Sequence, residues 1–381
     1  MAQEIFSKEE LSRYSRHLII PEFNIEGQRK LKAAKVLVVG TGGLGAPLLQ
    51  YLAAAGVGTI GVLDFDVVED SNLQRQVLFS TSDIGKSKVQ AAKERLEGLN
   101  PYINIITHNV LLSSQNALEI VKDYDLVADG TDNFPTRYLV NDACVLLGKP
   151  NVYASIYRFD GQVSVFNYTD KDGVVGPNYR DLFPSPPPPG LVPSCAEGGV
   201  LGVLPGIIGS LQANEVIKVI TGVGEPLVGR LFLFDAMNFE TRIVKVYRDE
   251  NNPVNGKNPT VTELIDYQEF CGFNMKQQDD VKSISVSEFL ELQNSDEPFQ
   301  LIDVREDFEY EISNIEGVHI PLADVEDEVD QIVSDKKVVV HCKAGGRSKK
   351  AIQLLEKDYG FTNLYNLTGG IDAYYEEVDA N

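Results

Sequence analysis

The stretch HCKAGGRS, residues 341–348, places a cysteine and an arginine at the two ends of a glycine-rich segment. The run KKVVV before it is typical of a short buried strand, and the spacing of Ala351 and Leu355 after it is typical of a helix. Backbone N–H groups converge at a turn between a strand and a helix, where the helix dipole adds positive potential. We therefore expect Cys342 to be a thiolate nucleophile, with Arg347 beside it.

A second group of residues has the spacing of a nucleotide-binding loop. VLVVGTGGLG puts Gly40, Gly42 and Gly45 between an expected strand and an expected helix. Such glycines let the backbone approach a phosphate at the helix N-terminus. Asp64 ends the next expected strand, where a carboxylate can accept hydrogen bonds from ribose hydroxyls. The pattern predicts a bound nucleotide without saying which one.

The elements that must position these residues follow an α/β rhythm. Strand-like runs alternate with helical patterns over residues 35–155, which predicts a mostly parallel sheet with helices on both faces. These runs are KVLVV, TIGVLDFD, INIITHN, DLVADG and NVYASI. GQVSVFNY, GRLFLF and TRIVKVY predict added antiparallel strands. The proline-rich stretch from Pro184 to Cys195 fits neither a helix nor a central strand, so we expect an extended crossover loop.

A change in composition divides the chain into two predicted α/β domains. Residues 249–261 are rich in Asn, Pro and Gly, which indicates the start of a linker. A new α/β alternation follows residue 281, with FQLIDVRE, KKVVVHC and NLYNL as strands. We predict a Rossmann-like domain over residues 1–248, a linker over 249–281 and a smaller domain over 282–381.

Composition narrows the class of protein. The 381 residues carry a net charge of −22, which argues against binding to nucleic acid or to anionic lipid. The apolar stretch from Val200 to Ile220 is interrupted by polar residues, so it predicts a buried helix and no membrane span. The N-terminus lacks the apolar core of a signal peptide. The four cysteines form no Cys-x-x-Cys pair, and such usage fits a reducing cytoplasm.

Two of the cysteines and one histidine suggest packing more than chemistry. Cys144 lies on an apolar helical face with Val140 and Leu147, which predicts a core position. Cys271, in EFCGF, has no evident mechanism, so a structural role is expected. By alternation along the strand, His341 should point inward and pack.

Several motifs, in order along the chain, carry a family resemblance. RYSRHLIIPEFNIEGQRKL, DFDVVEDSNLQRQ, GKSK and DGTDN resemble the ubiquitin-activating-enzyme superfamily, specifically its MoeB/ThiF branch, over most of residues 10–248. The resemblance implies ATP and Mg²⁺ as ligands. It implies adenylation of the C-terminal glycine of a small ubiquitin-like sulfur-carrier protein ending in Gly-Gly.

The resemblance also implies roles for individual residues of the nucleotide site. Asp132 would bind Mg²⁺, with Asn133 beside it. Arg16 would be lent to the ATP of a partner subunit, so a homodimer is expected. The other residues implied at the nucleotide are Gly40, Gly42, Gly43, Gly45, Asp64, Ser71, Asn72, Arg75 and Lys88.

The loop after Cys342 resembles a sulfur pocket more than a phosphate pocket. Four residues separate Cys342 from Arg347, whereas tyrosine-phosphatase loops hold five, and the shorter loop fits a single sulfur atom. LIDVREDFEY, EGVHIPL with His319, and NLTGGIDAY resemble the rhodanese domain over residues 283–377. The resemblance implies a persulfide on Cys342. Thiosulfate, mercaptopyruvate and the persulfide of a cysteine desulfurase remain open as sulfur donors.

Two further expectations come from comparison with the family pattern. Cys195 matches a cysteine that in relatives forms a covalent link to the carrier. Relatives also bind a structural zinc through two Cys-x-x-Cys pairs, and the matching positions here lack all four thiolates. We therefore expect no zinc site. The residues at those positions are Asn178, Asp181, Asn252 and Asn255.

The leading hypothesis is an adenylyltransferase fused to a sulfurtransferase. One alternative is a nicotinamide-dependent oxidoreductase with an appended non-catalytic binding module, which leaves Arg75, Lys88 and Asp132 without a role. Another is a catalytically idle adaptor. The sequence does not choose among carriers for molybdenum cofactor, thiamine or cysteine synthesis, or for tRNA thiolation.

Overall fold

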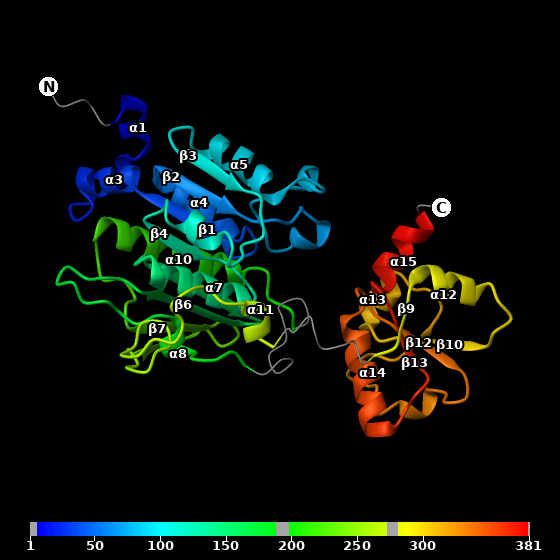
Figure 1. The fold of residues 1–381 in the computed structure, drawn as a ribbon. Helices are drawn as coiled ribbons and strands as arrows, with labels where there is room; N and C mark the ends of the chain where they lie inside the picture. Colours follow the sequence, from blue (N-terminus) through cyan, green and yellow to red (C-terminus); the bar gives the residue numbers. More distant parts are fainter. Residues whose placement is uncertain (1–5, 188–197, 273–280, 380–381) are drawn as a thin grey trace. The chain divides into compact units, whose positions relative to one another are not determined.

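The computed structural model describes residues 6–187, 198–272 and 281–379. The chain forms two compact units, Met1–Asn274 and Met275–Asn381 (Figure 1). Each unit has its own sheet and its own core. Within the described ranges, no helix combines the length and apolarity needed to cross a membrane.

The first unit is built on an eight-stranded sheet with the order β3-β2-β1-β4-β5-β6-β7-β8. Strands β3 to β5 in this order pair in parallel, and β5 to β8 pair antiparallel. This arrangement confirms the predicted parallel sheet with added antiparallel strands. The strands are β1 (Lys35–Val39), β2 (Thr59–Leu63), β3 (Asn104–His108), β4 (Leu126–Asp129), β5 (Asn151–Tyr157), β6 (Asp160–Phe166), β7 (Arg230–Asp235) and β8 (Glu240–Lys245).

Helices cover both faces of this sheet because its central strands are apolar on both sides. In β1, Val36 and Val38 belong to one core cluster, whereas Leu37 and Val39 belong to another. The first cluster includes residues of α4, α5 and α10, and the second includes residues of α6 and α7. The helices are α1 (Lys8–Arg13), α2 (Ser15–Leu18), α3 (Asn24–Ala33), α4 (Gly45–Ala55), α5 (Lys88–Leu99), α6 (Ala117–Val121), α7 (Phe134–Leu146), α8 (Tyr179–Leu182), α10 (Leu204–Thr221) and α11 (Tyr267–Phe270).

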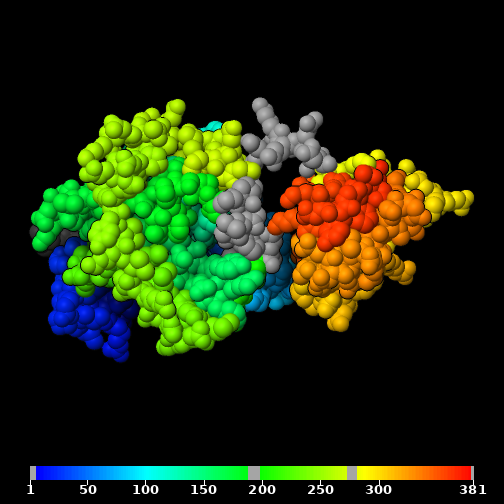
Figure 2. Space-filling view, turned by 90° about the horizontal axis from the view of Figure 1, so that it is seen from below, coloured from blue at the N-terminus to red at the C-terminus, as the bar shows by residue number. Residues whose placement is uncertain are grey.

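Much of the stretch predicted as a linker packs within the first unit. Asn252, Val254 and Tyr267 are buried, and α11 contacts α7. Figure 2 shows the yellow-green residues of this stretch lying against green residues of the same unit. Residues 249–272 therefore belong to the first unit, while residues 273–280 lie outside the described residues.

The second unit has a five-stranded parallel sheet with the order β11-β10-β12-β13-β9. In the central strand β12, Val338 and Val340 face one core cluster and Val339 faces another. The strands are β9 (Ser283–Ile284), β10 (Phe299–Asp303), β11 (Val318–His319), β12 (Lys337–His341) and β13 (Leu364–Leu367). The helices are α12 (Val286–Gln293), α13 (Asp307–Ile312), α14 (Gly346–Tyr359) and α15 (Gly370–Asp379).

Candidate active sites

A pocket lies where β1, β2 and β4 end in the first unit, the edge at which open α/β sheets bind ligands. Most of the residues implied at the nucleotide line it together. They are Gly40, Gly42, Gly43, Asp64, Arg75, Lys88, Asp132 and Asn133. Their convergence from segments up to 90 residues apart follows from the parallel order of the strands.

The glycine loop between β1 and α4 is shaped by two close backbone approaches. Gly40 has a φ of +91°, and a Cβ there would meet the carbonyl oxygen of Gly130 at 3.1 Å. A Cβ on Gly45 would lie 2.0 Å from the carbonyl oxygen of Gly40. Gly45 therefore starts the helix beside the pocket without lining it. Only glycine allows this turn, which brings the backbone of Gly40, Gly42 and Gly43 to the wall of the pocket.

Asp64 is held in one orientation by hydrogen bonds. Its Oδ2 accepts from the backbone N–H of Thr41 at 2.8 Å and from the Thr41 hydroxyl at 2.7 Å. Its Oδ1 accepts from the N–H of Asp66 at 3.0 Å. Oδ1 retains capacity for a further hydrogen bond. A fixed acceptor at the edge of the pocket suits a ribose hydroxyl.

The pocket also gathers positive side chains, including Lys88 and Arg75, and the carboxylate of Asp132. Lys88 is largely buried, and its Nζ lies 2.9 Å from Oδ2 of Asp66. Arg75 Nη1 donates to the carbonyl of Ser71 at 3.1 Å. Asp132 is exposed and has no ion-pair or hydrogen-bond partner for its carboxylate within the described residues. Hard oxygen donors of this kind are the ligands Mg²⁺ takes alongside nucleotide phosphates.

Some residues implied at the nucleotide do not reach this pocket. The Ser71 hydroxyl donates to Glu69 at 3.2 Å, and Asn72 Oδ1 accepts from the Glu69 N–H at 3.2 Å. Arg16 is exposed on α2 and does not line the pocket. Cys195 lies outside the described residues.

Sequence reasoning missed other pocket residues, including four polar side chains. Asp66, Gln76 and Thr131 lie inside the quoted motifs, and Arg137 follows DGTDN by four residues. Gln76 Oε1 and Arg137 Nε are buried without a hydrogen-bond partner. A buried donor and acceptor left open in this way suit a ligand that supplies their partners. The motif match could have indicated them, because three of the four are part of it.

The second candidate site is the loop that joins β12 to α14. Cys342 is buried, and its Sγ accepts from the N–H of Gly345 at 3.2 Å. The Ser348 hydroxyl lies 3.5 Å from the same sulfur and 2.6 Å from Oδ1 of Asn366. The loop backbone is also fixed by a hydrogen bond, because the N–H of Ile371 donates to the Cys342 carbonyl at 2.9 Å. The sulfur therefore accepts one backbone hydrogen bond and lies near one hydroxyl group.

Arg347, at the far end of this loop, forms a bidentate ion pair with Glu309 of α13. Nη2 lies 2.7 Å from Oε1, and Nη1 bonds Oε2. Burial raises the pKa of Glu309, but hydrogen bonds from Arg347 and from the Glu306 backbone outweigh it, so the pKa lies below its usual value. Glu309 is therefore ionised at neutral pH. Sequence reasoning assigned it no role.

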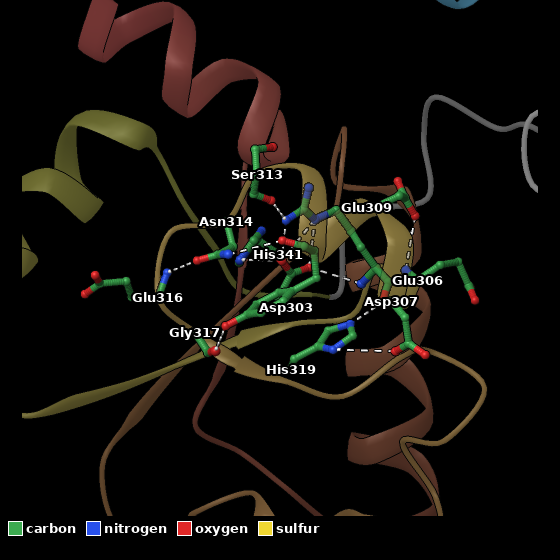
Figure 3. A network of polar contacts seen from close by, with 12 residues as sticks. Asp303, Glu306, Asp307, Glu309, Ser313, Asn314, Glu316, Gly317, His319 and His341 are labelled. Atoms are coloured by element: carbon green, nitrogen blue, oxygen red, sulfur yellow. Dashed lines mark hydrogen bonds and ion pairs between the residues drawn. The ribbon is translucent and has the colours of Figure 1, made fainter.

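A polar network lies beside this loop (Figure 3). Asp303 and Arg305 form a buried ion pair at 2.6 Å, and Arg305 also donates to the Ser313 carbonyl at 2.7 Å. His341 is fully buried, and neither ring nitrogen has a hydrogen-bond partner. Burial lowers the pKa of His341 to about 4, so the ring is neutral at pH 7. The predicted packing role of His341 agrees with this burial.

His319 in the same network fixes the chain near α13 (Figure 3). Its ring stacks on Tyr310 with centroids 4.4 Å apart, and Nε2 lies 2.8 Å from the Arg305 carbonyl oxygen. The network therefore connects β11 to the segment that carries Glu309.

The positions that match the zinc ligands of relatives come together as an asparagine cluster (Asn178, Asp181, Asn252 and Asn255). Asn178 Nδ2 donates to Asn255 Oδ1 at 3.0 Å. Asn252 Nδ2 donates to Asp181 Oδ1 at 2.7 Å and to Asn178 Oδ1 at 3.3 Å. Amide N–H groups thus point into the centre, and the side chains satisfy one another. This donor set does not fit zinc, which needs thiolate, imidazole or carboxylate ligands.

A buried ion pair lies next to the asparagine cluster. Arg180 donates to both oxygens of Asp142, at 2.8 and 2.7 Å, and the Tyr267 hydroxyl donates to Asp142 Oδ2 at 2.8 Å. The Arg180 guanidinium also lies over the ring of Phe270. These contacts attach α11 to α7 and α8. They bury the neighbouring Cys271, and Cys144 is buried in the same core cluster, as predicted.

Residues 14–254 match the model of the ThiF family. The chain belongs to the ThiF family. Residues 285–377 also match the Rhodanese-like domain. The ThiF match contains the nucleotide pocket, and the rhodanese match contains the Cys342 loop.

Relatives of this ThiF-family chain carry both domains or the first alone. “Probable adenylyltransferase/sulfurtransferase MoeZ” of Mycobacterium tuberculosis is 47% identical over 378 residues, covering 98% of this chain and 94% of the relative. “Adenylyltransferase and sulfurtransferase MOCS3” of Drosophila yakuba is 42% identical over 388 residues, covering 98% and 84%. “Sulfur carrier protein adenylyltransferase” of Thermus thermophilus is 57% identical over 267 residues, covering 70% and 98%.

Solved structures resemble the ThiF portion. MccB of E. coli, in a crystal structure with ATP, has a TM-score of 0.55 and 26% identity, covering 64% of this chain and 73% of that chain. PaaA has a TM-score of 0.55 and 25% identity, covering 65% and 77%. The match to the ThiF adenylyltransferase family implies that this chain uses ATP.

Proposed function

We propose that this enzyme adenylates the C-terminal glycine of a ubiquitin-like sulfur-carrier protein and then converts it to a thiocarboxylate with sulfur from Cys342. The observation that carries the proposal is the convergence of Arg75, Lys88 and Asp132 on a glycine-lined pocket. The alternative, a nicotinamide-dependent oxidoreductase, gives these three charged side chains no role. The ThiF and rhodanese matches, and the names of the relatives, support adenylation joined to sulfur transfer in one chain.

The adenylation step needs charge neutralisation and no general base. The attacking carboxylate of the carrier is ionised at pH 7, since its ordinary pKa is about 3.3–3.7. Its oxygen bonds the α-phosphorus while pyrophosphate leaves with the electron pair of the broken bond. Arg75 and Lys88 would offset the charge that collects on the phosphates. Arg16 would be supplied by the second subunit of a homodimer, consistent with its exposed position on α2.

Mg²⁺ would be held by Asp132. The ion would supply positive charge that reduces the repulsion between the phosphates and the incoming carboxylate. The Asn133 side chain accepts from the Thr136 N–H at 3.0 Å and so begins α7. This N-cap fixes the backbone on which Asp132 stands.

The sulfur step would begin with a persulfide on Cys342. Its terminal sulfur bonds the carbonyl carbon of the acyl-adenylate, and AMP leaves with the electron pair of the broken bond. A thiolate then attacks Sγ of Cys342 and releases the carrier thiocarboxylate. We assign this thiolate to Cys195 from the family resemblance. A dithiol reductant would reduce the resulting disulfide and so restore the two thiols. A cytoplasmic location would supply such a reductant.

The test of the overall proposal is carrier-dependent release of pyrophosphate. Purified chain with ATP, Mg²⁺ and a small carrier ending in Gly-Gly should exchange labelled pyrophosphate into ATP. The same carrier lacking its last glycine should not support exchange, because the reacting carboxylate is then displaced. Absence of exchange with carriers of the molybdopterin, thiamine, cysteine and tRNA-thiolation classes would exclude adenylation. The carrier that works best identifies the pathway.

We further propose that the asparagine cluster has the structural role that a zinc site has in relatives. Protein purified without chelator should hold far less than one zinc per chain, and chelator should leave Tm unchanged. Asn252→Ala should destabilise the first unit by about 1–3 kcal/mol, because Asn178 and Asp181 lose a buried donor. The exposed neighbour variant Asn251→Ala is the matched control. A content near one zinc per chain, or a Tm that falls with chelator, would contradict the proposal.

A further inference from the structure

The Arg347–Glu309 ion pair sits at the edge of the sulfur-transfer loop. Arg347 Nη2 and Glu309 Oε1 are 2.7 Å apart, and the two side chains are only 21% and 15% exposed. Arg347 follows Gly345 by two residues, and the Gly345 N–H donates to Cys342 Sγ at 3.2 Å. The pair therefore places a neutralised guanidinium, not a free cation, next to the sulfur.

Other charges around the loop do not restore a strong anion site. Arg305 is already paired with Asp303 inside the network of Figure 3. Glu306 and Asp307 are exposed at the start of α13, the helix that carries Glu309, and they add negative charge there. Lys343 is exposed in the loop and has no side-chain partner within the described residues. Lys343 is thus the lysine of loop residues 342–348, while Lys349 and Lys350 follow on α14 and make interactions of their own.

This charge arrangement bears on which molecule loads Cys342. Thiosulfate carries two negative charges at neutral pH, whereas a persulfide carries one. A carboxylate paired with Arg347 repels a dianionic donor at this loop about twice as strongly as a monoanionic one. The donor choice therefore depends on whether Arg347 is free or paired.

We propose that Glu309 is a specificity-determining residue, which disfavours the thiosulfate dianion and leaves a persulfide of another thiol as the sulfur donor for Cys342. The inference rests on the proposed role of Cys342 in sulfur transfer. The Cys342 thiolate attacks the outer sulfur of the donor persulfide, forms the new S–S bond and releases the donor thiolate with the electron pair of the broken bond. With thiosulfate the same attack releases sulfite.

The test compares two sulfane donors that differ in charge. The full-length protein is given thiosulfate, a dianion, or benzenethiosulfonate, a monoanion, with cyanide as acceptor, and thiocyanate is measured. Glu309→Gln frees Arg347 from its counter-charge and keeps the side-chain shape. The ratio of kcat/KM for thiosulfate to kcat/KM for benzenethiosulfonate should rise about tenfold, mainly through KM, and the rise should shrink at high salt.

Glu311→Gln is the matched control, because Glu311 lies on the same helix, is exposed and has no contact with Arg347 within the described residues. It changes net charge equally and should leave the ratio unchanged. An unchanged or lower ratio in Glu309→Gln would overturn the inference. So would an equal rise in Glu311→Gln, since the effect would then come from net charge alone.

A second pair of variants tests the same inference if Glu309→Gln alone does not fold. Arg347→Gln alone leaves Glu309 uncompensated and should lower the thiosulfate ratio several-fold. The double variant Arg347→Gln/Glu309→Gln removes both charges and should return the ratio to near the wild-type value, whatever its absolute rate. A ratio that stays low in the double variant would overturn the inference. Thiocyanate formation that persists in Cys342→Ala would instead overturn the proposed function.

Discussion

Cys342→Ala should abolish thiocarboxylate formation while leaving carrier-dependent pyrophosphate exchange intact. We expect sulfur transfer to fall at least a thousandfold, as is common when a covalent nucleophile is removed. The loop should keep its shape, because the Ile371 and Asp372 N–H groups hold it through backbone carbonyls at 2.9 and 3.1 Å. The assays are mass spectrometry of the carrier and exchange of labelled pyrophosphate.

The control for Cys342→Ala is Cys144→Ala. Cys144 is also buried, and it packs in the core of the first unit without lining the nucleotide pocket. Its removal should lower stability modestly and should leave both reactions in place. Thiocarboxylate formation at the wild-type rate in Cys342→Ala would contradict the role assigned to the second unit.

Asp132→Asn should impair adenylation and leave the sulfur chemistry at Cys342 intact. Pyrophosphate exchange should fall about a thousandfold, because a neutral amide is a poor ligand for Mg²⁺ and leaves phosphate repulsion uncompensated. Thiocyanate formation at Cys342 should be unchanged. The folded state should be little affected, since the Asp132 carboxylate is exposed and makes no hydrogen bond or ion pair within the part of the chain that the structure describes.

The exposed variant Asp172→Asn, in a turn that does not line the pocket, controls for the loss of one negative charge. Raising the Mg²⁺ concentration should partly restore exchange in Asp132→Asn and should do nothing for Asp172→Asn. Exchange at the wild-type rate in Asp132→Asn would show that the metal is held elsewhere. Together with Cys342→Ala, this variant separates the two chemistries in one chain.

The parallel sheet and the nucleotide pocket could be predicted from the sequence because their signals are local. The apolar runs give the strands, and Gly40 and Gly45 lie in a turn whose backbone contacts only glycine allows. The parallel order then brings Asp64 and Asp132 to one edge. These placements follow from strand direction alone, and no side-chain detail is needed to reach them.

The ion pair of the sulfur loop could not be predicted in this way. Glu309 lies 38 residues before Arg347, and nothing in the spacing distinguishes it from the other acidic residues of α13. The same holds for Tyr267, which reaches Asp142 across 125 residues. Its stretch looked like a linker because its composition is polar. Its burial depends on a few side chains, not on an apolar pattern.

The asparagine cluster has a consequence for an enzyme that handles reactive sulfur. Persulfides and the oxidants that accompany them attack thiolates, and a cysteine-ligated metal site offers four of them. Amide side chains joined by hydrogen bonds contain no sulfur to be oxidised or persulfidated. The loops that meet at Asn178 and Asn252 should therefore stay in place under peroxide stress, when the chemistry at Cys342 is itself at risk.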